Sequence, residues 1–348
     1  MATLTEASIG SRKGVRYFIY SVITFIILRG MLLGGIAIYK KVFPPAPTPA
    51  TLAFGKLPKL PFPESTMKSL KFTLETADVG IPEFPHLSKV YLMPKIASNL
   101  LSLDFAKEKA KRLGFDSEPQ QTSESIYKFT HKTAPATLET NIVNGAFSIS
   151  YDLNVDSSPL SVHPTQPEVA AATIKSFLSG ASLFPADLTG PISHKFLKTQ
   201  AGGLIPALSQ SDANLVRIDL FRKNIDELPA VTNKPSESNI WFMVSGIREK
   251  GKDVLAGEYH YFPVDETQVA TYTIKTGETA LQELISGNYY PASYGTTTDG
   301  DDIKIRKIYL AYYDPGIYTE FYQPVYVFEG DKNFVGYVPA VTPDYYGE

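Results

Sequence analysis

The sequence predicts an α+β protein in which an N-terminal transmembrane helix precedes antiparallel sheets covered by helices. Several runs alternate apolar and polar residues, as half-buried strands do, and others repeat apolar residues every three to four positions, as amphipathic helices do. A third observation, 23 consecutive and mostly apolar residues near the N-terminus, predicts the membrane helix.

The predicted transmembrane helix covers Tyr17–Tyr39. At about 34 Å it is long enough to cross the hydrocarbon core, and it exceeds the roughly 7–15 apolar residues of a cleaved signal peptide. We therefore expect an uncleaved signal anchor in the lipid bilayer. Arg12, Lys13 and Arg16 precede the helix, and Lys40 and Lys41 follow it. The positive-inside rule then predicts a cytoplasmic N-terminus, residues 1–16, and an extracytoplasmic C-terminal part.

Arg29 lies near the middle of this helix, where a charge is costly and marks function by default. It would pair with an acidic residue of another membrane helix or of a second copy, or else snorkel toward water. Gly30 and Gly34 form a GxxxG pattern, which favours close helix packing but is common in such helices. The three residues are candidates for membrane-helix pairing.

A proline-rich stalk is expected at residues 40–66. Seven prolines between positions 44 and 63 disfavour helix and favour an extended path of up to about 60 Å. The stalk would hold the domain away from the bilayer.

The first α+β unit is expected at residues 67–160. Ser102 would cap a helix that buries Ala106, Ala110 and Leu113, and Gly114 would end it. Strands are expected around Leu70–Leu74 and over Lys89–Met93, Ser125–His131 and Thr137–Leu153, the last with a turn at Asn144-Gly145.

The second unit is expected at residues 161–275. A helix would begin at Pro167, end near Gly180, and present one face of Val169, Ala172, Ile174 and Phe177. Residues 185–212 fit a long connection or a poorly patterned helix and loop, without a decision between them. Strands follow at Leu215–Phe221, Ile240–Ile247, Tyr259–Val264 and Ala270–Ile274.

The third unit, residues 276–348, has the clearest pattern. Thr276 would cap a short helix that ends at Gly287. The apolar positions change phase near Arg306-Lys307, which predicts a β-bulge. Three strands are expected, at Ile303–Tyr313, Pro324–Phe328 and Phe334–Val341.

Composition restricts the partners. The net charge is −3, but residues 1–63 hold eight of the 33 basic and one of the 36 acidic residues, which leaves the remainder at 25 basic against 35 acidic, or −10. An acidic domain disfavours nucleic acid and anionic headgroups. The chain has no cysteine, so it has no disulfide and no thiolate site, which suits an exported bacterial protein.

The sequence shows no readable catalytic or cofactor motif. The five histidines are scattered, and no zinc, nucleophile-elbow, phosphate-loop or dinucleotide pattern occurs. We expect no cofactor, no metal and no catalytic residue, although an enzyme with an unreadable site stays open. Asp299, Asp301 and Asp302 could bind Ca²⁺, but an acidic turn before a strand is the preferred interpretation.

The C-terminal third is rich in tyrosine and phenylalanine. Ordinary packing of a sheet is the simpler interpretation. The alternative is an exposed aromatic surface for a partner, for which the candidates are Tyr312, Tyr313, Tyr322 and Tyr326.

The order ETALQELISGNYY, IKIRKIYLAYYDP, QPVYVFEG and FVGYVPAV, within residues 276–341, resembles the PepSY-like modules of membrane-anchored YycH/YycI-type proteins. Those proteins regulate a cell-wall sensor kinase, and the resemblance implies repeated helix-plus-sheet units and no catalytic residue. The stalk and the following AFGKLPKLPFPES also look like uncharacterised single-pass proteins of candidate-phylum bacteria.

Three functions are therefore considered. The leading hypothesis is a non-enzymatic extracytoplasmic binding or regulatory protein that contacts another envelope protein or self-associates through its membrane helix. The second is a structural or assembly component of the cell envelope. The third is an enzyme acting on cell-wall or peptide substrates.

Overall fold

The computed structural model describes residues 18, 20–22, 24–32, 35, 49–76, 80–95, 101–200 and 203–347. It divides into two units, Met1–Pro49 and Ala50–Glu348. In the first unit the described residues from Phe18 to Gly35 are helical. Within the described residues, no helix is both long and apolar enough to cross a bilayer. Because much of Tyr17–Tyr39 lies outside them, the transmembrane helix stays a prediction.

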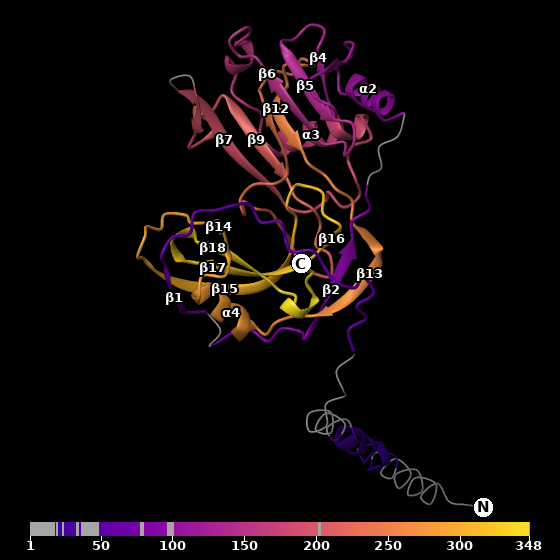
Figure 1. Ribbon diagram of the computed structural model, residues 1–348, viewed down its shortest axis with the longest axis vertical. Helices are drawn as coiled ribbons and strands as arrows, with labels where there is room; N and C mark the ends of the chain where they lie inside the picture. Colours follow the sequence, from indigo (N-terminus) through magenta and orange to yellow (C-terminus); the bar gives the residue numbers. More distant parts are fainter. Residues whose placement is uncertain are drawn as a thin grey trace, which may run out of the picture. The chain divides into compact units, whose positions relative to one another are not determined.

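A nine-stranded antiparallel sheet occupies the middle of the sequence (Figure 1). Its order is β3-β4-β5-β6-β12-β11-β9-β7-β8. The strands are β3 (Gln120–Gln121), β4 (Ile126–Thr130), β5 (Ala136–Asn141), β6 (Phe147–Tyr151), β7 (Ile192–Gln200), β8 (Gly203–Pro206), β9 (Leu215–Leu220), β11 (Ile240–Val244) and β12 (Val254–Tyr259). The helices α2 (Ser102–Arg112) and α3 (Pro167–Gly180) and the 3₁₀ turns η1 (Ser158–Leu160) and η2 (Gln210–Asp212) complete this region.

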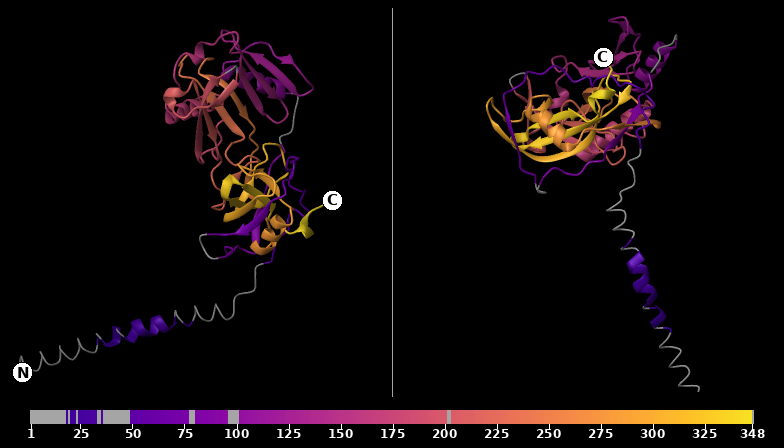
Figure 2. Two further views of the ribbon diagram at one scale, coloured as in Figure 1. Left: turned by 90° about the vertical axis from the view of Figure 1, so that its left-hand side faces the viewer. Right: turned by 60° about the horizontal axis from the view of Figure 1, so that its bottom comes forward.

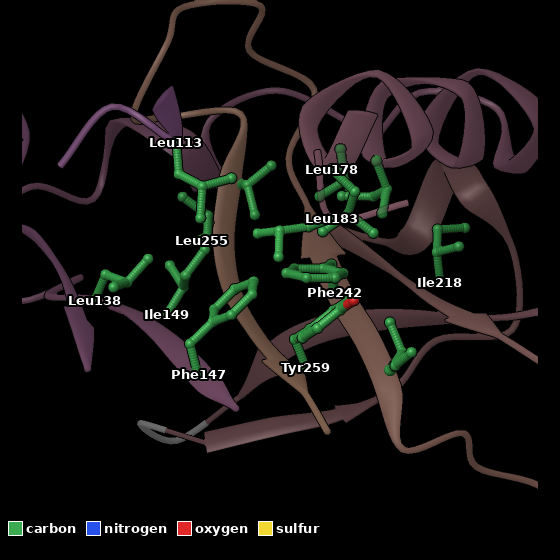
Figure 3. Packing of buried hydrophobic residues seen from close by; sticks show 14 of the residues in the cluster. Leu113, Leu138, Phe147, Ile149, Leu178, Leu183, Ile218, Phe242, Leu255 and Tyr259 are labelled. Atoms are coloured by element: carbon green, nitrogen blue, oxygen red, sulfur yellow. The ribbon is translucent and has the colours of Figure 1, made fainter. Parts of the chain in front are cut away.

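The core of this region forms where α3 packs on the sheet. Figure 3 shows Leu178 and Leu183 next to the ring of Phe242. On the neighbouring strands, the rings of Phe147 and Tyr259 stack with centroids 4.9 Å apart. Burial of these large apolar surfaces is the main force that holds the helix on the sheet.

A second sheet is built around β15 (Asp302–Tyr313), in the order β1-β15-β17-β18-β14, with β10 also paired to β15. The other strands are β1 (Lys71–Leu74), β10 (Ala230–Val231), β14 (Tyr290–Ser293), β17 (Pro324–Gly330) and β18 (Val335–Pro339). Side chains of the helix α4 (Gly277–Ile285) belong to the buried core of this sheet. The turn η3 (Asp331–Asn333) lies between β17 and β18, and the turn η4 (Pro343–Tyr345) follows β18.

A third, three-stranded sheet pairs β2 (Leu87–Leu92) with β13 (Asp265–Thr273) and β16 (Phe321–Tyr322). Figure 2 shows the nine-stranded sheet and the sheet built around β15 from two further directions. The architecture is α+β, with mostly antiparallel sheets and few helices among the described residues.

The sheets cross the boundaries expected from the sequence. The pairing of β6 with β12 joins strands from residues 67–160 and 161–275 in one sheet. In addition, β1 and β2 pair with strands near the C-terminus, β15 and β16. Each of these contacts links residues more than a hundred positions apart.

Several local predictions are confirmed. The Thr276 side chain caps α4 by accepting a hydrogen bond from the backbone N–H of Thr279 at 3.2 Å. The register of β15 against β17 shifts between Ile305 and Lys307, where the β-bulge was expected. The hairpin of β5 and β6 turns at Gly145, whose φ of 75° suits glycine.

Four local predictions are wrong. Residues 185–212 contain the strands β7 and β8, which form a hairpin. Tyr259–Val264 is not a strand, because β12 ends at Tyr259. The helix α3 buries Ala170, Ala171, Ile174 and Leu178, whereas Val169 and Ala172 are exposed. The N-cap of α2 is Leu101 instead of Ser102.

The stalk prediction needs a correction in its second half. Leu57 is fully buried, and its N–H donates to the carbonyl of Tyr345 at 2.8 Å. The ring of Phe54 stacks on Phe321 at 4.9 Å, and that of Phe62 on Tyr290 at 4.9 Å. The prolines do keep these residues out of helix, but the apolar residues between them bind the segment to the domain as a strap, residues 52–62.

Candidate functional site: a groove at an open sheet edge

One edge of β15 is only partly paired. The opposite edge is covered by β17 from Ile305 to Tyr312. On the open edge, β1 pairs in parallel with residues 302–305, and β10 pairs in parallel with residues 312–313. No described strand pairs with residues 306–311 on this side.

The hydrogen bonds at the two ends of the gap show which backbone groups face it. Glu75 N–H donates to Ile305 O at 2.9 Å, and Tyr312 N–H donates to Pro229 O at 2.8 Å. Tyr313 N–H points the other way, to Gln323 O. Because backbone groups alternate between the two edges of a strand, the N–H and C=O groups of Ile308 and Leu310 face the gap.

A cavity of about 720 Å³ lies along this gap, and we call it the edge groove. Lys307 and Tyr309 line it from one face of β15, and Leu310 and Tyr312 take part as well. Successive residues of a strand point to opposite faces. A cavity that contacts these four residues therefore lies along the edge of the strand. The full lining is Phe84, Pro85, Leu87, Ser88, Lys89, Asp226, Glu227, Leu228, Pro229, Lys307, Tyr309, Leu310 and Tyr312.

The apolar wall of the edge groove is held by the core below it. The ring of Phe84 lies edge-on to Tyr326 with centroids 5.0 Å apart, and Leu228 packs against two buried clusters. These contacts fix the wall before any ligand binds, which lowers the entropic cost of binding.

The other wall contains a strained turn. Ile225 and Leu228 exchange backbone hydrogen bonds at 3.1 and 2.9 Å, and the two residues between them, Asp226 and Glu227, have φ values of 50° and 64°. Such tight turns normally use glycine, asparagine or aspartate at positive φ, so Asp226 is tolerated there, whereas Glu227 is strained. Strain of this kind gathers at functional sites.

Asp226 is held by two side chains of β2. Lys89 Nζ lies 2.8 Å from Asp226 Oδ1, and the Tyr91 hydroxyl donates to Oδ2. Burial acts to raise the pKa of Asp226, but the hydrogen bonds from Lys89 and Tyr91 outweigh it and lower that pKa. Burial, and then the bond to Asp226, raises the pKa of Tyr91. Tyr91 therefore keeps its proton and works as a hydrogen-bond donor, because a tyrosine base needs a lowered pKa.

A second polar cluster surrounds the buried side chain of Arg222. Arg222, 5% exposed, donates from Nε to Asp314 at 2.8 Å and from Nη1 to Asp187 at 2.9 Å. Its Nη2 donates to the carbonyl of Phe262, and its guanidinium lies 4.5 Å from the ring centre of Tyr261. Burial acts to lower the pKa of Arg222, but the two carboxylates outweigh it and raise the pKa. Because its guanidinium donates to acceptors of the protein itself, Arg222 links the loops that carry Asp187, Phe262 and Asp314.

The exposed aromatic partner surface, the alternative to ordinary sheet packing, is wrong, and the four tyrosines pack in the core. Tyr312, Tyr313, Tyr322 and Tyr326 are each at most 1% exposed. Both faces of the sheet around β15 and β17 are covered, by α4 and β2 on one side and by the strap on the other. Only Tyr312 reaches the edge groove, from its floor.

The expected membrane-helix residues are described in part. Arg29 and Gly30 are helical and exposed, and a Cβ on Gly30 would meet nothing within 4 Å. Gly34 lies outside the described residues. Their role in helix pairing stays a prediction.

The acidic loop before β15 is occupied by internal contacts. Asp299 Oδ1 accepts from Ser69 N–H at 2.6 Å. Asp301 Oδ2 accepts from Thr298 N–H at 2.7 Å and lies 2.8 Å from Lys332 Nζ. Asp302 begins β15. Across the described residues, no three histidine or acidic side chains converge as a metal site.

Apart from Tyr312, sequence reasoning missed the residues of the edge groove. Lys307, Tyr309 and Leu310 belong to a strand that was predicted, and the predicted bulge marks where its pairing changes. That bulge was the available signal. Asp226 and Phe84 come from segments far away in sequence, and no local pattern links them to β15.

Comparisons with known proteins find weak similarity to solved structures. No protein-family model matches the chain, and no curated protein matches it. A solved uncharacterised protein from Eubacterium rectale is similar at 12% identity and a TM-score of 0.41, over 82% of this chain and 92% of that one. The Bacillus megaterium YpeB C-terminal domain is similar at 9% identity and a TM-score of 0.33, over 72% and 95%. At these scores the PepSY-like resemblance of residues 276–341 stays a prediction.

Proposed function

We propose that this chain is a membrane-anchored extracytoplasmic binding protein without catalytic activity, and that it contacts another envelope protein through the edge groove. The observation that carries the proposal is the groove itself. It is preformed, open, and lined by apolar side chains, two lysines, two acidic residues and a stretch of β15 that no described strand pairs with on this side. Ligand sites combine these features: an apolar wall and a few polar groups that orient the ligand.

The proposal also explains the charged groups around the groove. Tyr91 keeps its proton, and Asp226 is bound by Lys89. Neither is prepared for proton transfer, whereas both fix the position of the strained turn. The apolar stretch Tyr17–Tyr39 and its flanking positive charges support membrane anchoring with the domain outside.

Photocrosslinking in membranes tests the proposal. A benzophenone amino acid replaces Lys307 at the groove, and in a control it replaces Lys71, an exposed lysine of β1 outside the groove lining. We expect one envelope protein, identified by mass spectrometry, to crosslink at position 307 and not at position 71. The purified partner must then bind the purified chain.

Three results would count against the proposal. They are equal crosslinking at both positions, no crosslink at either, and a crosslink from position 307 to a second copy of the chain.

The membrane helix is tested separately with Arg29→Leu. Loss of co-purification in this variant, with the crosslink at position 307 weakened, is the result expected if Arg29 pairs the helix with the partner.

A further inference from the structure

We propose that the edge groove takes an extended peptide segment, which adds to the sheet as a strand between β1 and β10 and bonds to the backbone of Ile308 and Leu310. This inference rests on the proposed binding function and specifies the form of the ligand. An exposed row of strand N–H and C=O groups is a template for another strand, and several peptide-binding domains use it.

The backbone of β15 provides the first argument. Pairing on the open edge stops at Ile305 and resumes at Tyr312. Between them, no bond from the N–H or C=O of Ile308 or Leu310 to this side is found in the described part of the chain. Since no partner for these backbone groups is found on this edge in the described residues, a ligand in the gap can bond to them. A strand supplies donors and acceptors at the matching spacing.

The size of the gap provides the second argument. Residues 306–311 span about 20 Å at roughly 3.3 Å per residue, which is room for about four to six residues of a peptide. The gap is bounded at both ends by strands that already pair with β15. A single strand, about 4.8 Å wide, fits there, whereas the edge of a second folded copy would meet β1 and the Ile225–Leu228 turn.

The two faces of the gap predict the side chains of the peptide. On the face of Leu310, the neighbours are Phe84 and Leu228, which favour an apolar residue. On the other face, Lys307 Nζ lies 4.5 Å from the ring centre of Tyr309. Glu329 is its cross-strand neighbour on β17, but among the described residues no carboxylate forms an ion pair with Lys307. An acidic residue of the peptide would meet this lysine. A strand that alternates apolar and acidic residues fits both faces.

A display library of random peptides of about seven residues, selected against the full chain in detergent, tests the inference. We expect enriched peptides to alternate apolar and acidic residues. Each enriched peptide is then N-methylated at one backbone nitrogen at a time, which removes the N–H at that position. At alternate positions N-methylation should weaken binding about fivefold to tenfold, since each such position loses one backbone hydrogen bond, and at the positions between it should have little effect.

Variants of the chain locate the binding. Lys307→Glu should turn the preference from acidic to basic peptides, whereas Lys71→Glu, on the exposed face of β1, should leave it unchanged. Both residues are exposed, so neither variant threatens folding.

The outcomes separate this inference from the proposed function. Peptides that respond to Lys307→Glu but show no alternation on N-methylation would mean side-chain docking, which overturns strand addition and leaves the binding function intact. A library that enriches nothing, or peptides indifferent to Lys307→Glu, also overturns the inference. Failure of the photocrosslink at position 307 is what would overturn the proposed function.

Discussion

Arg222 donates from Nε to Asp314 Oδ2 at 2.8 Å, inside the protein, across 92 positions of sequence. Arg222 follows β9 of the nine-stranded sheet, and Asp314 follows β15 of the six-stranded sheet. The ion pair is thus one of the contacts that join the two sheets. Asn239 adds another, since its Nδ2 donates to the Asp314 carbonyl at 3.0 Å.

Arg222→Met should destabilise the protein by about 3–5 kcal/mol, because it leaves the buried Asp314 carboxylate and the partly buried Asp187 carboxylate without their cation. Urea unfolding at neutral pH measures this change. Adding Asp187→Asn and Asp314→Asn should restore a large part of the loss. The control is Arg112→Met, which removes an exposed pair with Glu108 and should cost no more than about 0.5 kcal/mol. Equal losses in the two single variants would contradict the interpretation.

Leu57→Ala should cost about 2–5 kcal/mol, because the Leu57 side chain is fully buried where the strap meets the C-terminal residues. Leu208→Ala is the matched control: Leu208 is 99% exposed, and its loss should change stability by no more than about 0.5 kcal/mol. Unfolding in urea, followed by tyrosine fluorescence, compares the two. A Leu57→Ala protein as stable as the control would mean that the strap is a free stalk after all.

Asp301 should give a defined pH dependence. The Lys332 ammonium, followed by the Thr298 N–H, lowers the pKa of Asp301 to about 2. A carboxyl whose pKa is lower in the folded state stabilises that state above its unfolded pKa, about 3.9, and loses this contribution as the pH falls through the folded pKa. The difference in urea midpoint between wild type and Asp301→Asn should therefore be constant above about pH 5 and shrink between about pH 4 and pH 2.

The same experiment in a Lys332→Met background identifies the cause. Without the ammonium, the effect of Asp301→Asn at neutral pH should become smaller. An effect of the same size in both backgrounds would show that Lys332 is not the source of the shift.

Glu227→Gly should raise the stability by about 1 kcal/mol, because glycine relieves the strain of a side chain at a φ of 64°. Thermal unfolding measures the gain. Glu124→Gly is a close control. Each of these glutamates accepts a hydrogen bond on its carbonyl from an amide side chain three residues earlier, but Glu124 is not at positive φ. The control should lose up to about 1 kcal/mol, so a loss of stability in both variants would argue against strain at Glu227.

Local chemistry decided the elements that the sequence predicted correctly. The Thr276 cap, the Gly145 turn and the bulge after Ile305 each depend on residues within a few positions of one another. Their signals survive in a single sequence because hydrogen bonding and backbone sterics act over that range. The α+β class follows from the same local periodicities.

The predictions failed where residues far away in sequence determine the environment of a segment. The strand β7 carries polar residues and alternates poorly, so only its partners β8 and β9 show that it is a strand. The prolines of the strap suggested a free stalk, but Leu57 and its neighbours find an apolar surface made by the last residues of the chain.

The edge groove shows this division most clearly. The sequence by itself determined that β15 is a long strand with a bulge after Ile305. Only the tertiary structure decided that β1 stops pairing at Ile305 and that β10 starts at Tyr312, which leaves the backbone groups of Ile308 and Leu310 facing the gap between these two strands. The reason is physical. The strands β10 and β1 lie about 80 and 230 residues before the part of β15 that each pairs with. Backbone hydrogen bonds form whatever side chains the two residues carry, so the sequence does not reveal which strands pair.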